Sequence, residues 1–229
     1  MPNDTWKKLF SCAMEQIEQA NIPHTSWSFG GGTVLMHKFN HRMSKDIDIF
    51  FRDKQLFAYI SPRVNDALEN ETIDFVEQDN FTKIYLQQGE IDFIYSPQIT
   101  SCIPTLQNIN GKDIYVDDPV EIIAKKIYYR AEEFRARDVF DMSLVFFKCK
   151  DELLKNCLFS EEKIQTLKKR ILELNQSGVL ESELSNIATL SGAKEVRGKE
   201  ILLSQDFFRC LERRFSLKRE KSFDSGLEL

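Results

Sequence analysis

The chain has 229 residues, of which 42% are hydrophobic, and it contains 18 Phe but only 9 Gly and 6 Pro. This composition is typical of a folded globular protein and argues against long disordered or repetitive regions. The net charge is -5, whereas domains that bind nucleic acid are usually basic. The charge therefore gives no indication of nucleic-acid binding, although it does not exclude it.

Cysteine usage and hydropathy indicate a cytoplasmic protein without a membrane partner. The five cysteines form no C-x-x-C pair, which fits reduced thiols better than a disulfide framework. No window reaches the roughly 18 continuous apolar residues of a membrane span, and the first residues lack the apolar core of a signal peptide. We therefore expect a cytoplasmic location.

The first elements form a helix and then a strand, a glycine turn and a second helix. Apolar side chains recur at helical spacing over residues 4–20, with Asp4 as the expected N-cap. Residues 27–29 indicate a short strand, three glycines turn the chain, and a helix follows from Thr33. A helix that starts directly after such a turn points backbone N–H groups at an anion.

The next elements are rich in β-strand signals. Residues 46–51 alternate Asp and Ile before two Phe, which predicts a central strand with Asp46 and Asp48 on one face. Residues 54–69 indicate a helix interrupted near Pro62. Three further β-rich runs cover residues 72–78, 81–88 and 90–96, and the last of them puts Asp92 and Ile94 on one face.

The composition becomes almost wholly helical from about residue 117. Pro119 suits the first turn of a helix, and amphipathic segments follow at 160–175, 179–190 and 199–215. The sequence therefore predicts two domains, an α/β domain over residues 1–116 and a helical domain over residues 117–229.

The carboxylates suggest a metal site. Asp46 and Asp48 on one strand face repel each other unless a cation compensates their charge. Mg²⁺ is usually held by one or two carboxylates together with substrate phosphates, so the pair beside a glycine turn indicates a metal-nucleotide site, with Asp92 as a third acid. A glycine cluster alone, or a D-x-D motif alone, is weak evidence for a metal-nucleotide site. The occurrence of both in this order, followed by a third Asp, is stronger evidence.

Several motifs occur in a fixed order. They are G-G-T-x-L (31–35), H-R-x-S-x-D-x-D-x-F (41–50), I-D-F (91–93), K-x-x-x-R (126–130) and R-D-x-x-D (137–141). Over residues 25–145 the chain resembles the AbiEii/AbiGii family, nucleotidyltransferase-like toxins of bacterial type IV toxin-antitoxin and phage-defence systems. The resemblance implies an α+β fold: an N-terminal polymerase-β-like nucleotidyltransferase domain with a small mixed β-sheet, followed by a helical C-terminal domain.

The resemblance also implies roles for residues of the first domain. Gly31, Gly32 and Thr33 match the phosphate-binding turn, where backbone amides and the hydroxyl would hold the β and γ phosphates of an NTP. Asp46 and Asp48 match the pair that binds Mg²⁺ or Mn²⁺, and Asp92 matches the third acid, which would help deprotonate the acceptor hydroxyl.

Other positions keep alternative interpretations. Lys126 matches a nucleotide-binding lysine, with Lys125 as its rival, while Asp138 and Asp141 match a late motif whose role is structural or close to the nucleotide. Arg42 either orders the approach to Asp46 or touches phosphate. Zinc binding by His37 and His41 is disfavoured, because no third ligand has suitable spacing.

The expected activity is a metal-dependent transfer of NMP from an NTP to an acceptor hydroxyl. By resemblance the acceptor is RNA, with the tRNA 3′ end as the leading candidate, and a cognate antitoxin restrains the protein. The motifs fix only the reaction class. Two alternatives stay open: an inactive NTP-binding regulatory module, and an NTP-dependent phosphotransferase that moves the γ-phosphoryl group.

Overall fold

The computed structural model describes residues 5–69, 71 and 74–224. It divides into two compact units, the first formed by Met1–Ile122 with Ala188–Gly192 and the second by Ile123–Ile187 with Ala193–Leu229. The expected boundary at residue 117 lies shortly before this division, which falls inside helix α4 (Pro119–Arg130). The α+β fold class predicted from the sequence is confirmed.

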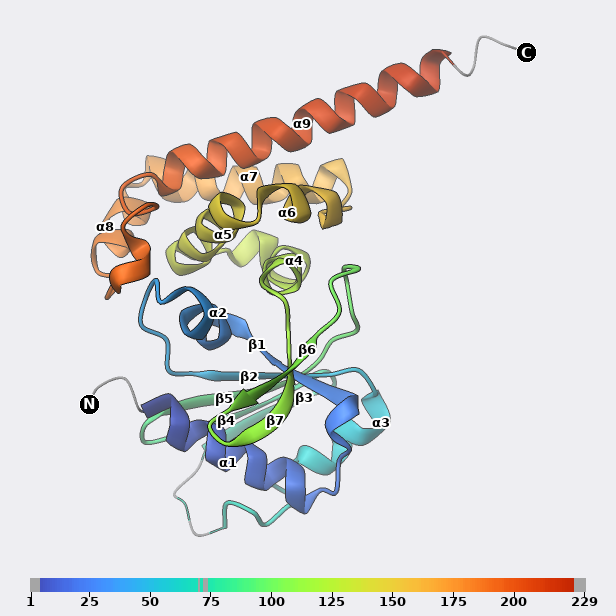
Figure 1. The fold of residues 1–229 in the computed structure, drawn as a ribbon, viewed down its shortest axis with the longest axis vertical. Coiled ribbons are helices and arrows are strands. Elements are labelled where there is room, and N and C mark those ends of the chain that lie inside the picture. The colour runs from blue at the N-terminus through green and yellow to red at the C-terminus, as the bar shows by residue number, and fades with distance from the viewer. Residues whose placement is uncertain (1–4, 70, 72–73, 225–229) are drawn as a thin grey trace. The chain divides into compact units, whose positions relative to one another are not determined.

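A mixed seven-stranded sheet with the order β3-β4-β5-β2-β1-β7-β6 forms the centre of the first unit (Figure 1). Strand β2 pairs antiparallel with β1 and parallel with β5, so it is central, as its apolar sequence predicts. The strands are β1 (Trp27–Gly30), β2 (Ile47–Phe51), β3 (Asp74–Gln78), β4 (Phe81–Leu86), β5 (Gly89–Tyr95), β6 (Thr105–Ile109) and β7 (Lys112–Val116).

The sequence located five of these strands. Residues 72 and 73, at the start of one predicted run, lie outside the described residues, and Asp46 precedes β2 instead of belonging to it. The hairpin of β6 and β7 was not predicted. Its two strands are short, and the turn between them contains Asn110 and Gly111, both with positive φ.

The helical elements of the first unit include α1 (Thr5–Gln19), α2 (Gly31–Phe39) and α3 (Lys54–Phe57), with short 3₁₀ turns η2 (His24–Ser26) and η3 (Ala58–Ile60). Helix α1 packs against β2 and β5, and the ring centroids of Phe10 and Phe29 are 5.4 Å apart. The fully buried Ile47 and Ile49 belong to the same apolar core. The expected N-cap Asp4 lies outside the described residues.

The helix predicted over residues 54–69 is wrong beyond Ile60. Ser61, the residue before Pro62, has an extended ψ of 128°, because a residue that precedes proline avoids the helical region. The buried Asn65 then donates hydrogen bonds to the carbonyl oxygens of Gln16 and Tyr59, and these bonds hold the chain in a compact loop.

The second unit is helical, as predicted. Helix α5 packs against α8 and α9, and the rings of Phe146 and Phe207 meet edge to face at 5.6 Å. No described helix combines the length and hydropathy needed to cross a bilayer. The helical elements from α4 onward are η4 (Ala131–Glu133), α5 (Ala136–Lys148), α6 (Lys150–Asn156), α7 (Glu161–Gln176), α8 (Val179–Ser185), η5 (Ser191–Ala193) and α9 (Glu200–Asp224).

Candidate active site

The glycine turn between β1 and α2 brings the backbone against an acidic side chain. Gly31 has a φ of +69°, in the left-handed region that favours glycine. A Cβ atom on Gly31 would lie 1.9 Å from Oδ2 of Asp48. Both the backbone conformation and the neighbouring carboxylate therefore require glycine, and the turn with the first N–H groups of α2 lies directly beside Asp48.

The pairing of β2 with β5 brings two of the predicted acids together. In this parallel ladder Asp48 is opposite Asp92, while Ile47 is opposite Ile91. Neighbouring residues of paired strands face the same side of a sheet, so both carboxylates lie on one face and the fully buried isoleucines on the other. Thus the structure brings Asp48 and Asp92 together beside Gly31.

Asp46 lies at the same edge of the sheet, immediately before β2. Its Oδ1 atom accepts a hydrogen bond of 3.3 Å from the backbone N–H of Glu90, at the start of β5. Glu90 is two residues before Asp92 and shares its face. We call the face of the sheet with Asp46, Asp48 and Asp92 the acidic face. It contains Glu90 as a fourth carboxylate, which the motifs did not indicate.

Lys83 on β4 neutralises part of this acidic face. It is the cross-strand partner of Asp92, and its Nζ lies 3.0 Å from Asp92 Oδ1 and 2.6 Å from Glu90 Oε2. The sequence analysis did not single out Lys83, although the alternation in residues 81–86 puts it on the face opposite Ile84 and Leu86. Only the pairing of β4 with β5 shows that it meets Asp92.

The pKa values reflect the crowding of charges on this face. Burial and the negative charge of Asp48 raise the pKa of Asp92 to about 6, and Lys83 opposes this increase. Burial alone would lower the pKa of Lys83, but its hydrogen bonds and charge contacts with Glu90 and Asp92 raise it. The lysine therefore stays charged and offsets negative charge of Asp92 and Glu90.

Thr33 and Arg42 hold the segment that leads into β2. The Oγ1 atom of the fully buried Thr33 donates a hydrogen bond of 2.6 Å to the carbonyl oxygen of Asp46. A Cβ atom on Gly32 would lie 2.7 Å from Nη2 of Arg42, whose side chain is only 6% exposed. These contacts fit an ordering role for Arg42, and they also put its positive charge against the first turn of α2.

A distant segment of the chain completes this part of the first unit. Thr189 forms a β-bridge with Arg42, and the backbone N–H of Met43 donates to the carbonyl oxygen of Ala188 at 2.8 Å. The N–H of Leu190 likewise donates to the carbonyl oxygen of His41 at 2.8 Å. His41 is therefore buried within this turn, and its partner segment could not be identified from sequence.

The acidic face has suitable chemistry for a hard divalent cation. Asp48 and Asp92 offer adjacent carboxylate oxygens, the donors that Mg²⁺ prefers, and burial together with the charge of Asp48 raises the pKa of Asp92. Among the residues described, no group of three or more His, Cys, Asp or Glu side chains is arranged to hold a metal ion. In this structure Lys83 contacts Asp92, and Asp46 contacts a backbone N–H.

The three late motif residues come together in the second unit. The Nζ atom of Lys126 donates hydrogen bonds of 2.7 Å to Asp138 and of 2.7 Å to Asp141, and all three side chains are buried. Burial alone would raise the pKa of Asp138, but the charges of Lys126 and Arg130 lower it. Lys126 thus forms a buried ion triad that joins α4 to α5.

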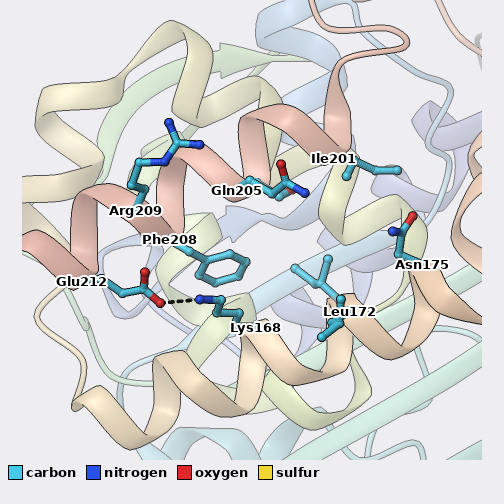
Figure 2. Close-up of a pocket in the computed structure, with 10 residues that line it drawn as sticks. Lys168, Leu172, Asn175, Ile201, Gln205, Phe208, Arg209 and Glu212 are labelled. Atoms are coloured by element: carbon cyan, nitrogen blue, oxygen red, sulfur yellow. Dashed lines mark hydrogen bonds and ion pairs between the residues drawn. The ribbon is translucent and has the colours of Figure 1, made fainter.

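The second unit also contains a cavity of about 320 Å³ between α7 and α9 (Figure 2). Phe208 and Leu172 contribute apolar walls, and an ion pair between Lys168 and Glu212 lies at one side (Figure 2). None of the residues predicted from the motifs lines this cavity.

The sequence profile of one family, "Nucleotidyl transferase AbiEii toxin, Type IV TA system", matches residues 14–227. No curated protein sequence matches the chain. Among solved structures, a proposed nucleotidyltransferase from H. pylori is 16% identical with a TM-score of 0.51, and the match covers 92% of this chain and 96% of that one. JHP933 from Helicobacter pylori is 17% identical with a TM-score of 0.49, with coverage of 94% and 96%. MenT4, a nucleotidyltransferase toxin from Mycobacterium tuberculosis, is 15% identical with a TM-score of 0.35, with coverage of 58% and 57%.

Proposed function

Because the chain belongs to the AbiEii nucleotidyltransferase toxin family of type IV toxin-antitoxin systems, we propose that it uses Mg²⁺ to transfer NMP from an NTP to a hydroxyl group of RNA. The leading acceptor is the 3′ end of tRNA, and a separately encoded antitoxin restrains the activity in the cytoplasm. The observation that carries the proposal is the pairing of Asp48 with Asp92 directly beside the Gly31 turn.

In the proposed reaction the acceptor oxygen attacks the α-phosphorus of the NTP. A bond forms between them, the bond to the β-phosphate oxygen breaks, and pyrophosphate leaves with the electron pair. Asp48 and Asp92 would hold the cation, which when bound would favour loss of the acceptor proton to water and would offset charge on the leaving group. The backbone N–H groups of the turn at Gly31 and Gly32 would hold the β and γ phosphates.

Asp46 and Thr33 support this arrangement from the entrance to β2. The Thr33 hydroxyl is already bonded to the carbonyl oxygen of Asp46, so its contribution in this conformation is to fix the distance between the turn and the acidic strand. Asp46 would join the cation by exchanging its bond to the Glu90 N–H for a metal contact. Arg42, packed on Gly32, would add positive charge near the triphosphate.

RNA as the acceptor is supported by exposed side chains of the second unit. Tyr128 and Tyr129, at the end of α4, are 51% and 46% exposed, and exposed aromatic rings can stack on nucleic-acid bases. Arg135 and Arg137 are also exposed and can contact phosphates. In this proposal Lys126, Asp138 and Asp141 hold α4 and α5 together. Tyr128, Tyr129, Arg135 and Arg137 lie within a few residues of them in the sequence.

The proposal is tested by incubating the purified protein with total RNA, Mg²⁺ and each of the four NTPs, labelled either on the α-phosphate or on the γ-phosphate. NMP transfer labels RNA only from the α-labelled NTP. Label that arrives only from the γ-labelled NTP would instead establish a phosphotransferase, and absence of both labels would support a module that binds NTP without turnover.

A pair of isosteric variants makes this test specific. Asp48→Asn keeps the shape of the side chain against Gly31 but removes its charge, and we expect RNA labelling to fall by at least about 100-fold while the protein stays folded. Asp113→Asn, at an exposed carboxylate on β7, should label RNA as the wild type does. Equal activity of Asp48→Asn and the wild type would contradict the assignment.

A further inference from the structure

Lys83 occupies an unusual position for a surface strand residue. The Nζ atom of Lys83 lies 3.0 Å from Oδ1 of Asp92, 3.1 Å from Oδ2 of Asp92 and 2.6 Å from Oε2 of Glu90. The Lys83 side chain is only 24% exposed. It therefore stands beside one of the two carboxylates proposed to hold the divalent cation. Family membership and the motifs assign no role to this residue.

A lysine and a divalent cation cannot both sit against Asp92 without a large repulsion. Two like charges in contact with the same carboxylate repel each other near a protein surface, and the repulsion is larger for a doubly charged ion. Lysine can move away, because its ammonium is a point charge on a flexible four-carbon stem. Binding of the cation at Asp92 therefore requires Lys83 to withdraw.

The structure offers Lys83 a second resting place. Glu90, whose side chain is 40% exposed, lies two residues before Asp92, near the start of β5, and already contacts the ammonium group. The ring of Tyr85 lies on the same face of β4, with its centroid 5.8 Å from Nζ. A small rotation of the side chain can release Asp92 while the ammonium keeps its contacts with a carboxylate and an aromatic face.

We propose that Lys83 is an internal counter-ion that competes with the divalent cation for Asp92 and thereby lowers the affinity of the free protein for metal. The triphosphate carries negative charge of its own, so its arrival favours the cation over the ammonium group. In this arrangement the cation enters together with the nucleotide. The inference rests on the proposed function, because it takes Asp48 and Asp92 as the metal-holding pair.

The test measures Mn²⁺ binding to the NTP-free protein, using the electron paramagnetic resonance signal of free Mn²⁺ at pH 8. Lys83→Gln, which removes the charge and keeps a polar side chain, should bind Mn²⁺ about tenfold more tightly than the wild type. Lys83→Arg keeps the charge and should bind as weakly as the wild type. Lys112→Gln, which removes a lysine paired with Glu18 elsewhere in the first unit, should change nothing.

A second measurement uses the wild type alone, so that it does not depend on the folding of a variant. Acetylation of Lys83 by a limiting amount of acetic anhydride, read by peptide mass spectrometry, should become several-fold faster when Mn²⁺ is saturating, because the amine leaves Asp92. An unchanged acetylation rate would overturn the inference, as would Mn²⁺ binding by Lys83→Gln that is no tighter than in the wild type.

The outcomes separate this inference from the proposed function. If the wild type labels RNA in a Mg²⁺-dependent way but Lys83→Gln gains no Mn²⁺ affinity, the role of Lys83 is wrong and the reaction assignment survives. If neither protein binds Mn²⁺ and RNA labelling does not need a divalent ion, the metal site itself is wrong and both proposals fall.

Discussion

Replacing Asp92 with Asn should make the metal-free protein more stable near neutral pH. The pKa of Asp92 is about 6, compared with an ordinary value of 3.8. This carboxyl therefore holds its proton more tightly in the folded state than in the unfolded state. The contribution of Asp92 to stability therefore falls as the pH rises from about 4 to about 6, because ionisation of this carboxyl favours the unfolded chain in that window.

The size of the effect follows from the same pKa values. One pKa unit corresponds to about 1.4 kcal/mol, so ionised Asp92 costs the folded state about 3 kcal/mol at pH 7. Asn has the shape of the protonated acid and avoids this cost. For a chain of this size about 3 kcal/mol corresponds to an increase in melting temperature of roughly 6–12 °C.

The assay is thermal unfolding of both proteins in EDTA, followed by circular dichroism between pH 4 and pH 8. The two melting temperatures should coincide near pH 4 and diverge as the pH rises through about 6. Asp113→Asn, at the exposed position used above as a control, should show no such divergence. An Asp92→Asn protein that is no more stable than the wild type at pH 7 would refute the account of the acidic face.

Two further substitutions test the turn and the buried triad. Gly31→Ala should destabilise the protein by about 2 kcal/mol or more in denaturant titrations, because Gly31 has a positive φ and the added methyl group would clash with Asp48. The control Gly111→Ala should show only the backbone strain, because Gly111 has a φ of +84° but its added methyl group would meet no other atom. Lys126→Met should cost about 3–5 kcal/mol, since it leaves buried carboxylates without their lysine. Adding Asp138→Asn and Asp141→Asn should restore much of that stability; a Lys126→Met protein of normal stability with a raised KM for NTP would instead assign Lys126 to the nucleotide.

The sequence predicted the part of the site that depends on local order. Alternation along residues 46–51 and 90–96 fixed the faces of Asp48 and Asp92, because side chains in a strand alternate strictly. The three glycines followed by an apolar helix marked the turn, because positive φ and close backbone approach both require glycine. The alternation along a strand and the glycine turn can both be recognised without any knowledge of tertiary structure.

The remaining contacts depend on which segments become neighbours, and a single sequence does not carry that information. Lys83 meets Asp92 only because β4 pairs antiparallel with β5 in one register. Thr189 reaches Arg42 from far along the chain, and nothing in its local pattern marks it. The helix expected to Glu69 failed for a local reason, because Ser61 precedes Pro62, and for a tertiary one, because Asn65 bonds to Gln16 in α1.

The two units handle paired carboxylates in different ways, and the difference supports the choice of active site. Asp138 and Asp141 share a buried lysine that bonds to both, and the pKa of Asp138 is lowered, as expected for a carboxylate whose charge is compensated. At Asp92 the pKa is raised although Lys83 is in contact, because burial disfavours the charged carboxylate and Asp48 adds a second negative charge. A buried carboxylate beside a second acid costs stability in its charged form, and a cation supplied with the substrate removes that cost. This difference is the physical reason to propose the face of Asp48 and Asp92 for metal and nucleotide, and a structural role for the triad of Lys126.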